Sequence, residues 1–135
     1  MPPRRFSLEE ASGLLPRLTE ILPRMQEAKL QHDRLQETVQ EFQRKMASNG
    51  HLLEGQLNQA RQEMASAAAR VNDLIAEVHA LGCEVKDVDL GLVDFRSEMD
   101  GREVYLCWKL GEAAVGWWHE LDAGFAGRQP LPEGK

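Results

Sequence analysis

The sequence predicts an α+β fold, in which a long antiparallel two-helix coiled-coil hairpin is followed by a small antiparallel β-sheet of three or four strands. Two ladders of apolar residues, spaced alternately four and three apart, run through residues 14–81 and predict the hairpin. Beyond residue 82 the pattern changes to short β-branched and aromatic runs separated by turn signals, which predicts the sheet. We therefore expect a single domain over 1–135, with a helical hairpin arm at 6–81 and a β-meander with a C-terminal tail at 82–135.

The N-terminal segment carries the signals of a helix start. The Ser7 hydroxyl can accept a hydrogen bond from the N–H of Glu10, whose carboxylate can accept one from the Ser7 N–H, and this is the pattern of a capping box. Phe6 is placed as a hydrophobic staple. Because Pro16 would break an established helix, we expect a short helix to about Gly13 and a new helix that has Pro16 in its first turn.

The two ladders define the long helices. The first contains Leu14, Leu18, Ile21, Met25, Ala28, His32, Leu35, Val39, Phe42 and Met46. The second contains Leu53, Leu57, Ala60, Met64, Ala67, Val71, Leu74, Val78 and Leu81. Pro23 should bend the first helix, and His32, as a polar residue on the seam, should set its register. The tetrapeptide 48–51 can reverse the chain, so the two helices should pack against each other.

The second half of the chain reads as strands and turns. Gly82 can adopt the left-handed conformation that ends a helix. Strands are expected at 84–88, 92–96, 102–110 and 115–120. The dipeptide Asp100-Gly101 is the strongest hairpin signal in the chain.

Charge and composition exclude several classes of partner. The net charge is -6, and residues 83–135 hold eleven acidic against six basic residues, which argues against nucleic acid. No apolar run approaches the roughly 20 residues of a membrane span, so we expect no membrane and a cytoplasmic protein. Cys83 and Cys107 match no paired-cysteine metal motif and are expected to be reduced thiols.

Aromatic residues concentrate in the predicted sheet. Six of the eight lie within residues 95–125. Both alternating faces of 104–108 are apolar, although a two-layer fold needs to bury only the face toward the helices. A second subunit, the C-terminal tail or a ligand should cover the other face, in that order. The candidate interface residues are Val104, Leu106 and Trp108.

The best candidate site follows the last predicted strand, where an imidazole and two carboxylates adjoin two indoles and an arginine follows. The candidate ligand-binding residues are Trp117, Trp118, His119, Glu120, Asp122 and Arg128. His119 could be a general base oriented by Glu120 or Asp122, or a metal ligand. Neighbouring strand residues point to opposite faces, however, so His119 and Glu120 should diverge.

A metal at His119 would need further ligands from elsewhere, such as Asp94, Cys107 or Glu112. The structural alternative is that His119 hydrogen-bonds a backbone group and that Arg128 pairs with Asp122 or Glu120. Cys107 could face His119 across a hairpin as a nucleophile, although a buried strand cysteine is the commoner case. No short sequence motif fixes a metal, a cofactor or a catalytic residue, so none is assigned.

Six segments carry a resemblance to a known family: 6–11, 82–87, 91–95, 104–112, 118–120 and 124–131. In these segments, and over nearly its whole length, the chain resembles a bacterial family named domain of unknown function 2203. The resemblance implies a cytoplasmic prokaryotic protein whose characteristic residues lie in the sheet and the tail. The family has no established activity, so the resemblance transfers no catalytic role.

Two functions of different classes are consistent with these patterns. The first is a non-enzymatic protein-interaction or oligomerisation module, with a homodimer favoured, that associates through the sheet or the Ala-rich face of the second helix. The alternative is a small-ligand or metal-binding protein, conceivably an enzyme, with its site around Trp117–Asp122 and Arg128. Two indoles and an arginine would suit a planar or anionic ligand.

Overall fold

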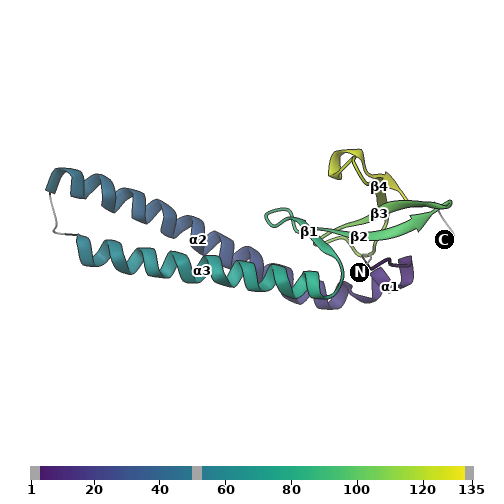
Figure 1. The fold of residues 1–135 in the computed structure, drawn as a ribbon, viewed down its shortest axis with the longest axis horizontal. Helices are drawn as coiled ribbons and strands as arrows, with labels where there is room; N and C mark the ends of the chain where they lie inside the picture. The colour runs from purple at the N-terminus through teal and green to yellow at the C-terminus, as the bar shows by residue number, and fades with distance from the viewer. Residues whose placement is uncertain (1–3, 50–52, 133–135) are drawn as a thin grey trace.

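The computed structural model describes residues 4–49 and 53–132. In chain order its elements are α1 (Leu8–Gly13), α2 (Leu15–Asn49), α3 (Glu54–Ala80), β1 (Glu84–Asp87), β2 (Leu92–Met99), β3 (Arg102–Lys109), β4 (Trp117–Glu120), the 3-10 helix η1 (Phe125–Gly127) and β5 (Gln129–Pro130). The helices α2 and α3 lie side by side in opposite directions and project from the end of the molecule that holds the sheet (Figure 1). The predicted α+β class is confirmed, and the sheet has five strands instead of three or four.

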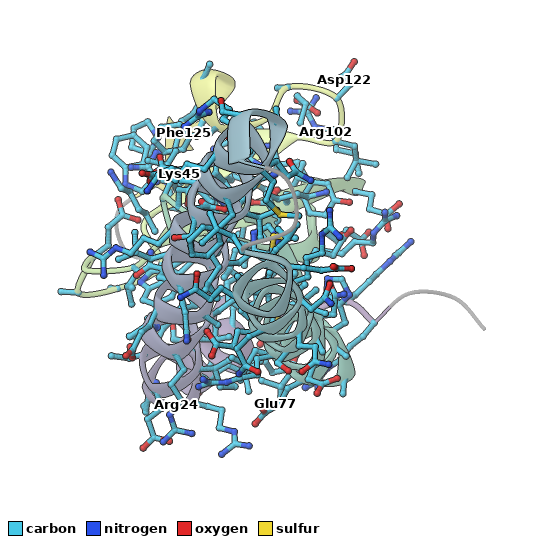
Figure 2. All side chains as sticks on the ribbon, turned by 90° about the vertical axis from the view of Figure 1, so that its left-hand side faces the viewer. Arg24, Lys45, Glu77, Arg102, Asp122 and Phe125 are labelled. Carbon is cyan, nitrogen blue, oxygen red and sulfur yellow. The ribbon has the colours of Figure 1, made fainter. Side chains whose placement is uncertain are left out.

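The apolar ladders form the buried side of the two long helices. Among the residues that the structure describes, every ladder position is buried or half-buried. Charged side chains cover the other faces: Arg24 and Glu77 point away from the helices (Figure 2), and Glu77 pairs with Arg17 at 2.6 Å. Burial of the ladders is therefore confirmed, whereas the interlocked packing of a coiled coil stays a prediction. Within the described ranges, none of the helices combines the length and the apolar character that a membrane crossing requires.

The helix starts follow their sequence signals. The Glu10 N–H donates to Ser7 Oγ at 3.0 Å, and the Ser7 N–H donates to Glu10 Oε1 at 2.9 Å, which completes the capping box. Since α2 begins at Leu15, Pro16 lies in its first turn as expected. Pro23 lies inside the same helix, and the bend expected there stays a prediction.

The chain reversal expected at 48–51 is described only in part. Ser48 and Asn49 still belong to α2, and the rest of the expected turn lies outside the described residues. The returning helix ends at Ala80, and Gly82 follows with a φ of 100°, the left-handed conformation expected of it.

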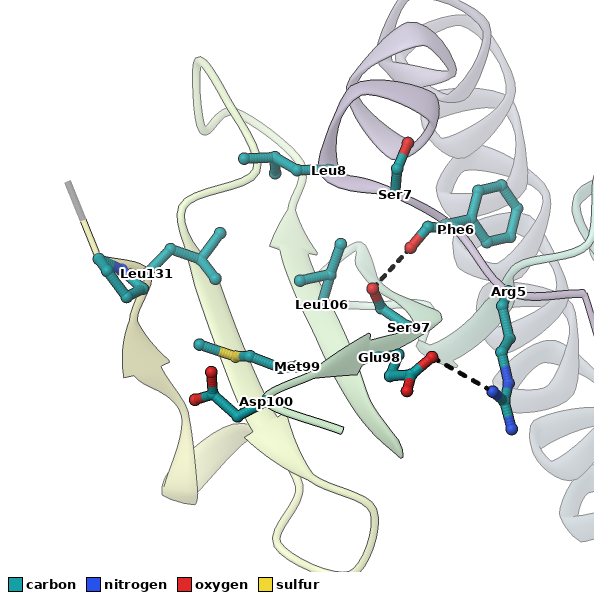
Figure 3. Close-up of a pocket in the computed structure, with 11 residues that line it drawn as sticks. Arg5, Phe6, Ser7, Leu8, Ser97, Glu98, Met99, Asp100, Leu106 and Leu131 are labelled. Atoms are coloured by element: carbon teal, nitrogen blue, oxygen red, sulfur yellow. Dashed lines mark hydrogen bonds and ion pairs between the residues drawn. The ribbon is translucent and has the colours of Figure 1, made fainter. Parts of the chain in front are cut away.

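The N-terminal segment attaches the helices to the sheet. The Phe6 N–H donates to the Arg96 carbonyl at 2.7 Å, and Ser97 Oγ donates to the Phe6 carbonyl at 2.6 Å (Figure 3). The Phe6 ring meets Phe95 edge to face at 5.4 Å. This segment therefore lies against β2 beyond the stretch of β2 that pairs with β1.

The five strands form an antiparallel meander in the order β1-β2-β3-β4-β5. The β2–β3 turn is Asp100-Gly101, with φ of 53° and 80°, so the predicted hairpin is confirmed. The sequence did not predict β5, because it spans only two residues and contains Pro130.

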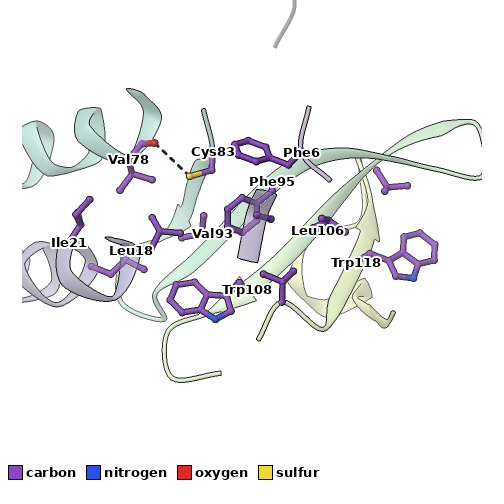
Figure 4. Close-up of a cluster of buried hydrophobic side chains, with 14 of the residues drawn as sticks. Phe6, Leu18, Ile21, Val78, Cys83, Val93, Phe95, Leu106, Trp108 and Trp118 are labelled. Carbon is purple, nitrogen blue, oxygen red and sulfur yellow. Dashed lines mark hydrogen bonds between the residues drawn. The ribbon is translucent and has the colours of Figure 1, made fainter. Parts of the chain in front are cut away.

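One face of the sheet packs on the helices and forms the core (Figure 4). Residues from β2, β3 and β4 on this face contact α1, α2 and the end of α3. The candidate interface residues Val104, Leu106 and Trp108 are 0%, 4% and 1% exposed and belong to this core. These three residues therefore lie on the face that packs against the chain's own helices, and not on the opposite face, which was expected to meet a second subunit.

Candidate metal centre

The opposite face of the sheet carries, on three neighbouring strands, three side chains of types that ligate metals. Asp94 of β2 lies directly opposite Cys107 of β3. His119 of β4 lies opposite Tyr105, two residues from Cys107, and therefore on the same face. Their donor atoms, one carboxylate oxygen, one sulfur and one imidazole nitrogen, all lie within 4.8 Å of one another. Strand alternation and register, rather than a local motif, bring these residues together.

All three side chains are almost wholly buried and line the same cavity. Asp94 is 3%, Cys107 1% and His119 2% exposed. The cavity has a volume of about 300 Å³, and Lys86, Leu92, Tyr105 and the loop 121–125 complete its lining. Buried polar side chains normally satisfy one another or bind a ligand, so a group of this composition at a cavity is a candidate site.

Two hydrogen bonds fix the orientation of the His119 ring. Nδ1 lies 2.7 Å from the Glu120 carbonyl oxygen. A carbonyl can only accept, so Nδ1 carries a proton and donates it there. Nε2 lies 2.9 Å from Asp94 Oδ2. The expectation that His119 hydrogen-bonds a backbone group is confirmed, and its other nitrogen faces the acidic and thiol groups.

Electrostatics raise the pKa of two of the three groups. Burial raises the pKa of the Asp94 carboxyl, although the neighbouring His119 acts in the opposite direction. Burial and the negative charge of Asp94 raise the pKa of the Cys107 thiol to about 11. Cys107 is thus a thiol near neutral pH, and both His119 nitrogens already have partners. This arrangement disfavours Cys107 as a nucleophile in the metal-free protein.

Arg128 stands beside the site and makes a different pair from the one expected. Its guanidinium donates to both carboxylate oxygens of Glu112, at 3.3 and 2.7 Å, instead of pairing with Asp122 or Glu120. It also donates to Cys107 Sγ at 3.9 Å. Burial alone would raise the pKa of Glu112, but hydrogen bonds from Arg128 and a backbone N–H outweigh it and lower that pKa.

The Arg128 guanidinium contacts two aromatic rings. It lies 4.3 Å from the Trp117 ring centre and 4.6 Å from that of Phe125. Stacking and the two-point hydrogen bond restrict its position, so the N–H that reaches Cys107 is well oriented.

Only some of the ligand-binding residues predicted from the sequence lie at the cavity. His119 and Asp122 line the cavity, and Asp122 extends outward from the loop (Figure 2). Trp117 and Arg128 flank it. Trp118 points into the core, and Glu120 pairs with Arg102 at 2.6 Å. The expected divergence of His119 and Glu120 is thus confirmed.

A larger cavity, of about 650 Å³, lies between the N-terminal segment and the β2–β3 hairpin (Figure 3). Leu8, Met99 and Leu131 give it an apolar lining. Within 4–49 and 53–132, the only close group of three histidine, cysteine or acidic residues is that of Asp94, Cys107 and His119. The smaller cavity is therefore the better candidate site, because of the side chains that line it and in spite of its volume.

Comparison with protein families matches residues 4–131 to the family described as "Uncharacterized conserved protein (DUF2203)". The match covers both the helices and the sheet. No curated protein and no solved structure gives a significant match.

Proposed function

This chain belongs to the DUF2203 family of uncharacterised conserved proteins, and we propose that it is a metalloprotein that binds one divalent transition-metal ion, with zinc favoured, through Asp94, Cys107 and His119. The observation that carries the proposal is that the donor atoms of a carboxylate, a thiol and an imidazole lie within 4.8 Å of one another in the lining of a cavity. Zinc accepts all three donor types, and thiolate and imidazole disfavour magnesium or calcium.

The charge of the complete site supports a divalent ion. In the metal-bound site the Asp94 carboxylate and the Cys107 thiolate, formed by loss of the thiol proton, supply two negative charges, while His119 binds as a neutral imidazole. A divalent cation then makes the buried centre neutral. A neutral centre avoids the cost of isolated charge in a low-dielectric interior, which a monovalent ion or an empty ionised site would incur.

Neighbouring groups already orient two of the three ligands. The Glu120 carbonyl accepts a hydrogen bond from His119 Nδ1 and so directs Nε2, now hydrogen-bonded with Asp94, toward the metal position. The N–H of Arg128 that reaches Cys107 Sγ would stabilise a metal-bound thiolate. Tetrahedral zinc needs donor separations of about 3.5 Å, so His119 Nε2 and Asp94 Oδ2, which lie 2.9 Å apart, would separate by about 0.5 Å on binding.

The number of protein ligands favours an accessible centre over a purely structural one. Structural zinc sites are usually closed by four protein ligands, whereas three ligands leave a position for water or another molecule. Here the described residues provide three donors, and all three border the same cavity. The proposal therefore includes an exchangeable fourth ligand.

Native mass spectrometry with added zinc tests the proposal. One zinc per chain is expected for the unchanged protein, and Asp94→Asn, Cys107→Ser and His119→Ala should each lose it. Cys83→Ala is the matched control, because Cys83 is equally buried but lies in the core away from the three donors. Zinc retained by all three site variants, or lost equally by the control, would contradict the proposal.

Self-association through the hairpin arm is a second proposed role. Away from the sheet, the arm is held by a small separate cluster of Val39, Leu57 and Ala60, with Phe42, Met46 and Met64 only partly buried around it. A second copy packed along these residues would enlarge a core that is small for so long an arm. Sedimentation equilibrium should show a dimer, and a monomer at all concentrations would contradict this role.

A further inference from the structure

We infer that the fourth coordination position of the metal receives a small carboxylate with an apolar substituent, held by Lys86 and by Leu121. This inference rests on the proposed metal site and specifies the class of ligand that completes it. It draws on the charge and the apolar character of the cavity wall.

The cavity gives a ligand direct access to the metal position. Asp94, Cys107 and His119 form part of its lining, and the loop 121–125 forms another part. Its volume of about 300 Å³ would hold a small organic molecule but not a large cofactor. A ligand atom bound to the metal would therefore leave the rest of the molecule between the sheet and this loop.

The charge of the wall favours a monoanion. Among the described residues, Lys86 is the only lysine or arginine that lines the cavity, and its Nζ lies 4.9 Å from the centre of the Tyr105 ring. The Tyr105 ring in turn lies 5.4 Å from the His119 ring, so the ammonium lies one ring away from a metal ligand.

Apart from the proposed metal ligand Asp94, neither Glu84 nor Asp122 binds the ammonium closely. Its contact with Glu84 is 3.5 Å, long for a charged pair. Asp122, the other charged side chain of the wall besides the donors, is exposed and extends outward (Figure 2). Because the loaded metal centre is neutral, one ammonium balances one carboxylate, whereas a phosphate dianion would leave an unbalanced charge.

The apolar part of the cavity wall favours an apolar substituent on the bound carboxylate. Leu121 and Phe125 are 42% and 39% exposed and both line this cavity. They are two of the four large apolar side chains that are exposed in the described ranges. Exposed apolar side chains grouped at a cavity are typical of ligand sites, and here they lie where a carboxylate's substituent would extend.

Cobalt provides a visible probe, since Co²⁺ replaces zinc in such sites and its absorption changes with the fourth ligand. The Co²⁺-loaded protein is titrated with benzoate, acetate and inorganic phosphate. We expect saturable spectral changes with both carboxylates, tighter binding of benzoate than of acetate, and weaker binding of phosphate. Lys86→Met should weaken benzoate binding about fivefold. Leu121→Ser should reduce the preference for benzoate over acetate.

Lys45→Met is the matched control, because Lys45 is an exposed lysine of α2 whose nearest partner is Glu41; it should leave every affinity unchanged. A normal Co²⁺ spectrum that none of the anions alters would overturn the inference and leave the metal site standing. Phosphate binding as tight as that of benzoate, or an unaltered affinity in Lys86→Met, would also overturn it. Failure to bind Co²⁺ would remove the metal site and this inference together.

Discussion

Asp94 Oδ2 and His119 Nε2 lie 2.9 Å apart although 25 residues separate them in the chain, and both side chains are almost wholly buried. Burying an acidic and an imidazole group costs free energy unless their polar atoms all have hydrogen-bonding partners or a bound ion. Cys107 completes the group from the intervening strand. The sheet thus brings a carboxyl, a thiol and an imidazole, all of which are types of metal ligand, close together.

Zinc should stabilise the folded protein. Zinc should bind the folded site and not the dispersed ligands of the unfolded chain. A free zinc concentration 100 times the Kd would therefore raise the free energy of unfolding by about 2.7 kcal/mol. Differential scanning calorimetry with zinc, and again after a chelator is added in excess, should show a higher Tm with zinc only. Cys107→Ser should melt at the same temperature in both conditions. A zinc-induced rise that survives this substitution would place the ion elsewhere.

Both thiols should react slowly in the folded, metal-free protein. Burial raises the pKa of Cys83 and of Cys107 to about 11, so at pH 8 only about one thiol in a thousand is ionised. Alkylation with iodoacetamide, followed by mass spectrometry, should accelerate about tenfold per pH unit up to that pKa. Zinc should protect Cys107 but not Cys83. Rapid labelling of Cys107 at pH 7 would contradict the predicted slow reaction and would support Cys107 as a nucleophile.

The Arg128–Glu112 pair should stabilise the metal-free protein in a pH-dependent way. The pKa of Glu112 is lowered in the fold from its ordinary 4.5, so its stabilisation is complete above that value and is lost as pH falls through the folded-state pKa. Glu112→Gln should therefore cost about 1–2 kcal/mol at pH 7 and much less at pH 3.

Urea unfolding at the two pH values, in the presence of a chelator, measures the difference between Glu112→Gln and the unchanged protein. Glu98→Gln serves as the control, because Glu98 is exposed and pairs with Arg5 only at 3.6 Å. The same cost at both pH values would show that Glu112 acts through something other than its charge.

The N-terminal attachment should be a major source of stability. Phe6 is 2% exposed, packs on Phe95 and is hydrogen-bonded to β2 through its backbone. Phe6→Ala should cost about 3–4 kcal/mol by the loss of buried surface and the cavity left behind. Leu30→Ala, at a position that is 50% exposed, should cost less than about 0.5 kcal/mol. If urea unfolding showed that both variants lose the same free energy of unfolding, this assignment of the core would be contradicted.

Helices were the most predictable part of the fold. The ladder spacing, the Ser7–Glu10 capping box and the position of Pro16 are local signals, and each is realised in the structure. The Asp100-Gly101 turn and the meander were predictable for the same reason. The strand β5 was not, because its partner, rather than its own two residues, makes it a strand.

The candidate site was predictable only in part. His119 stood out beside two indoles, and Asp94 and Cys107 were among its possible partners, but only the pairing register shows that they share its face. Arg128 was expected to bind a neighbour in sequence. Its true partner, Glu112, belongs to the turn after β3, and the meander brings that turn to it. Side-chain partners across strands depend on tertiary packing that no local pattern encodes.

X-ray absorption spectroscopy of the zinc-loaded protein tests the central claim most directly, because it identifies the atoms bound to the metal. We expect one sulfur at about 2.3 Å and nitrogen or oxygen atoms at about 2.0–2.1 Å in four-coordinate zinc. The sulfur contribution should vanish in Cys107→Ser and persist in Cys83→Ala. A zinc environment of nitrogen and oxygen alone in the unchanged protein would contradict a centre built by Asp94, Cys107 and His119.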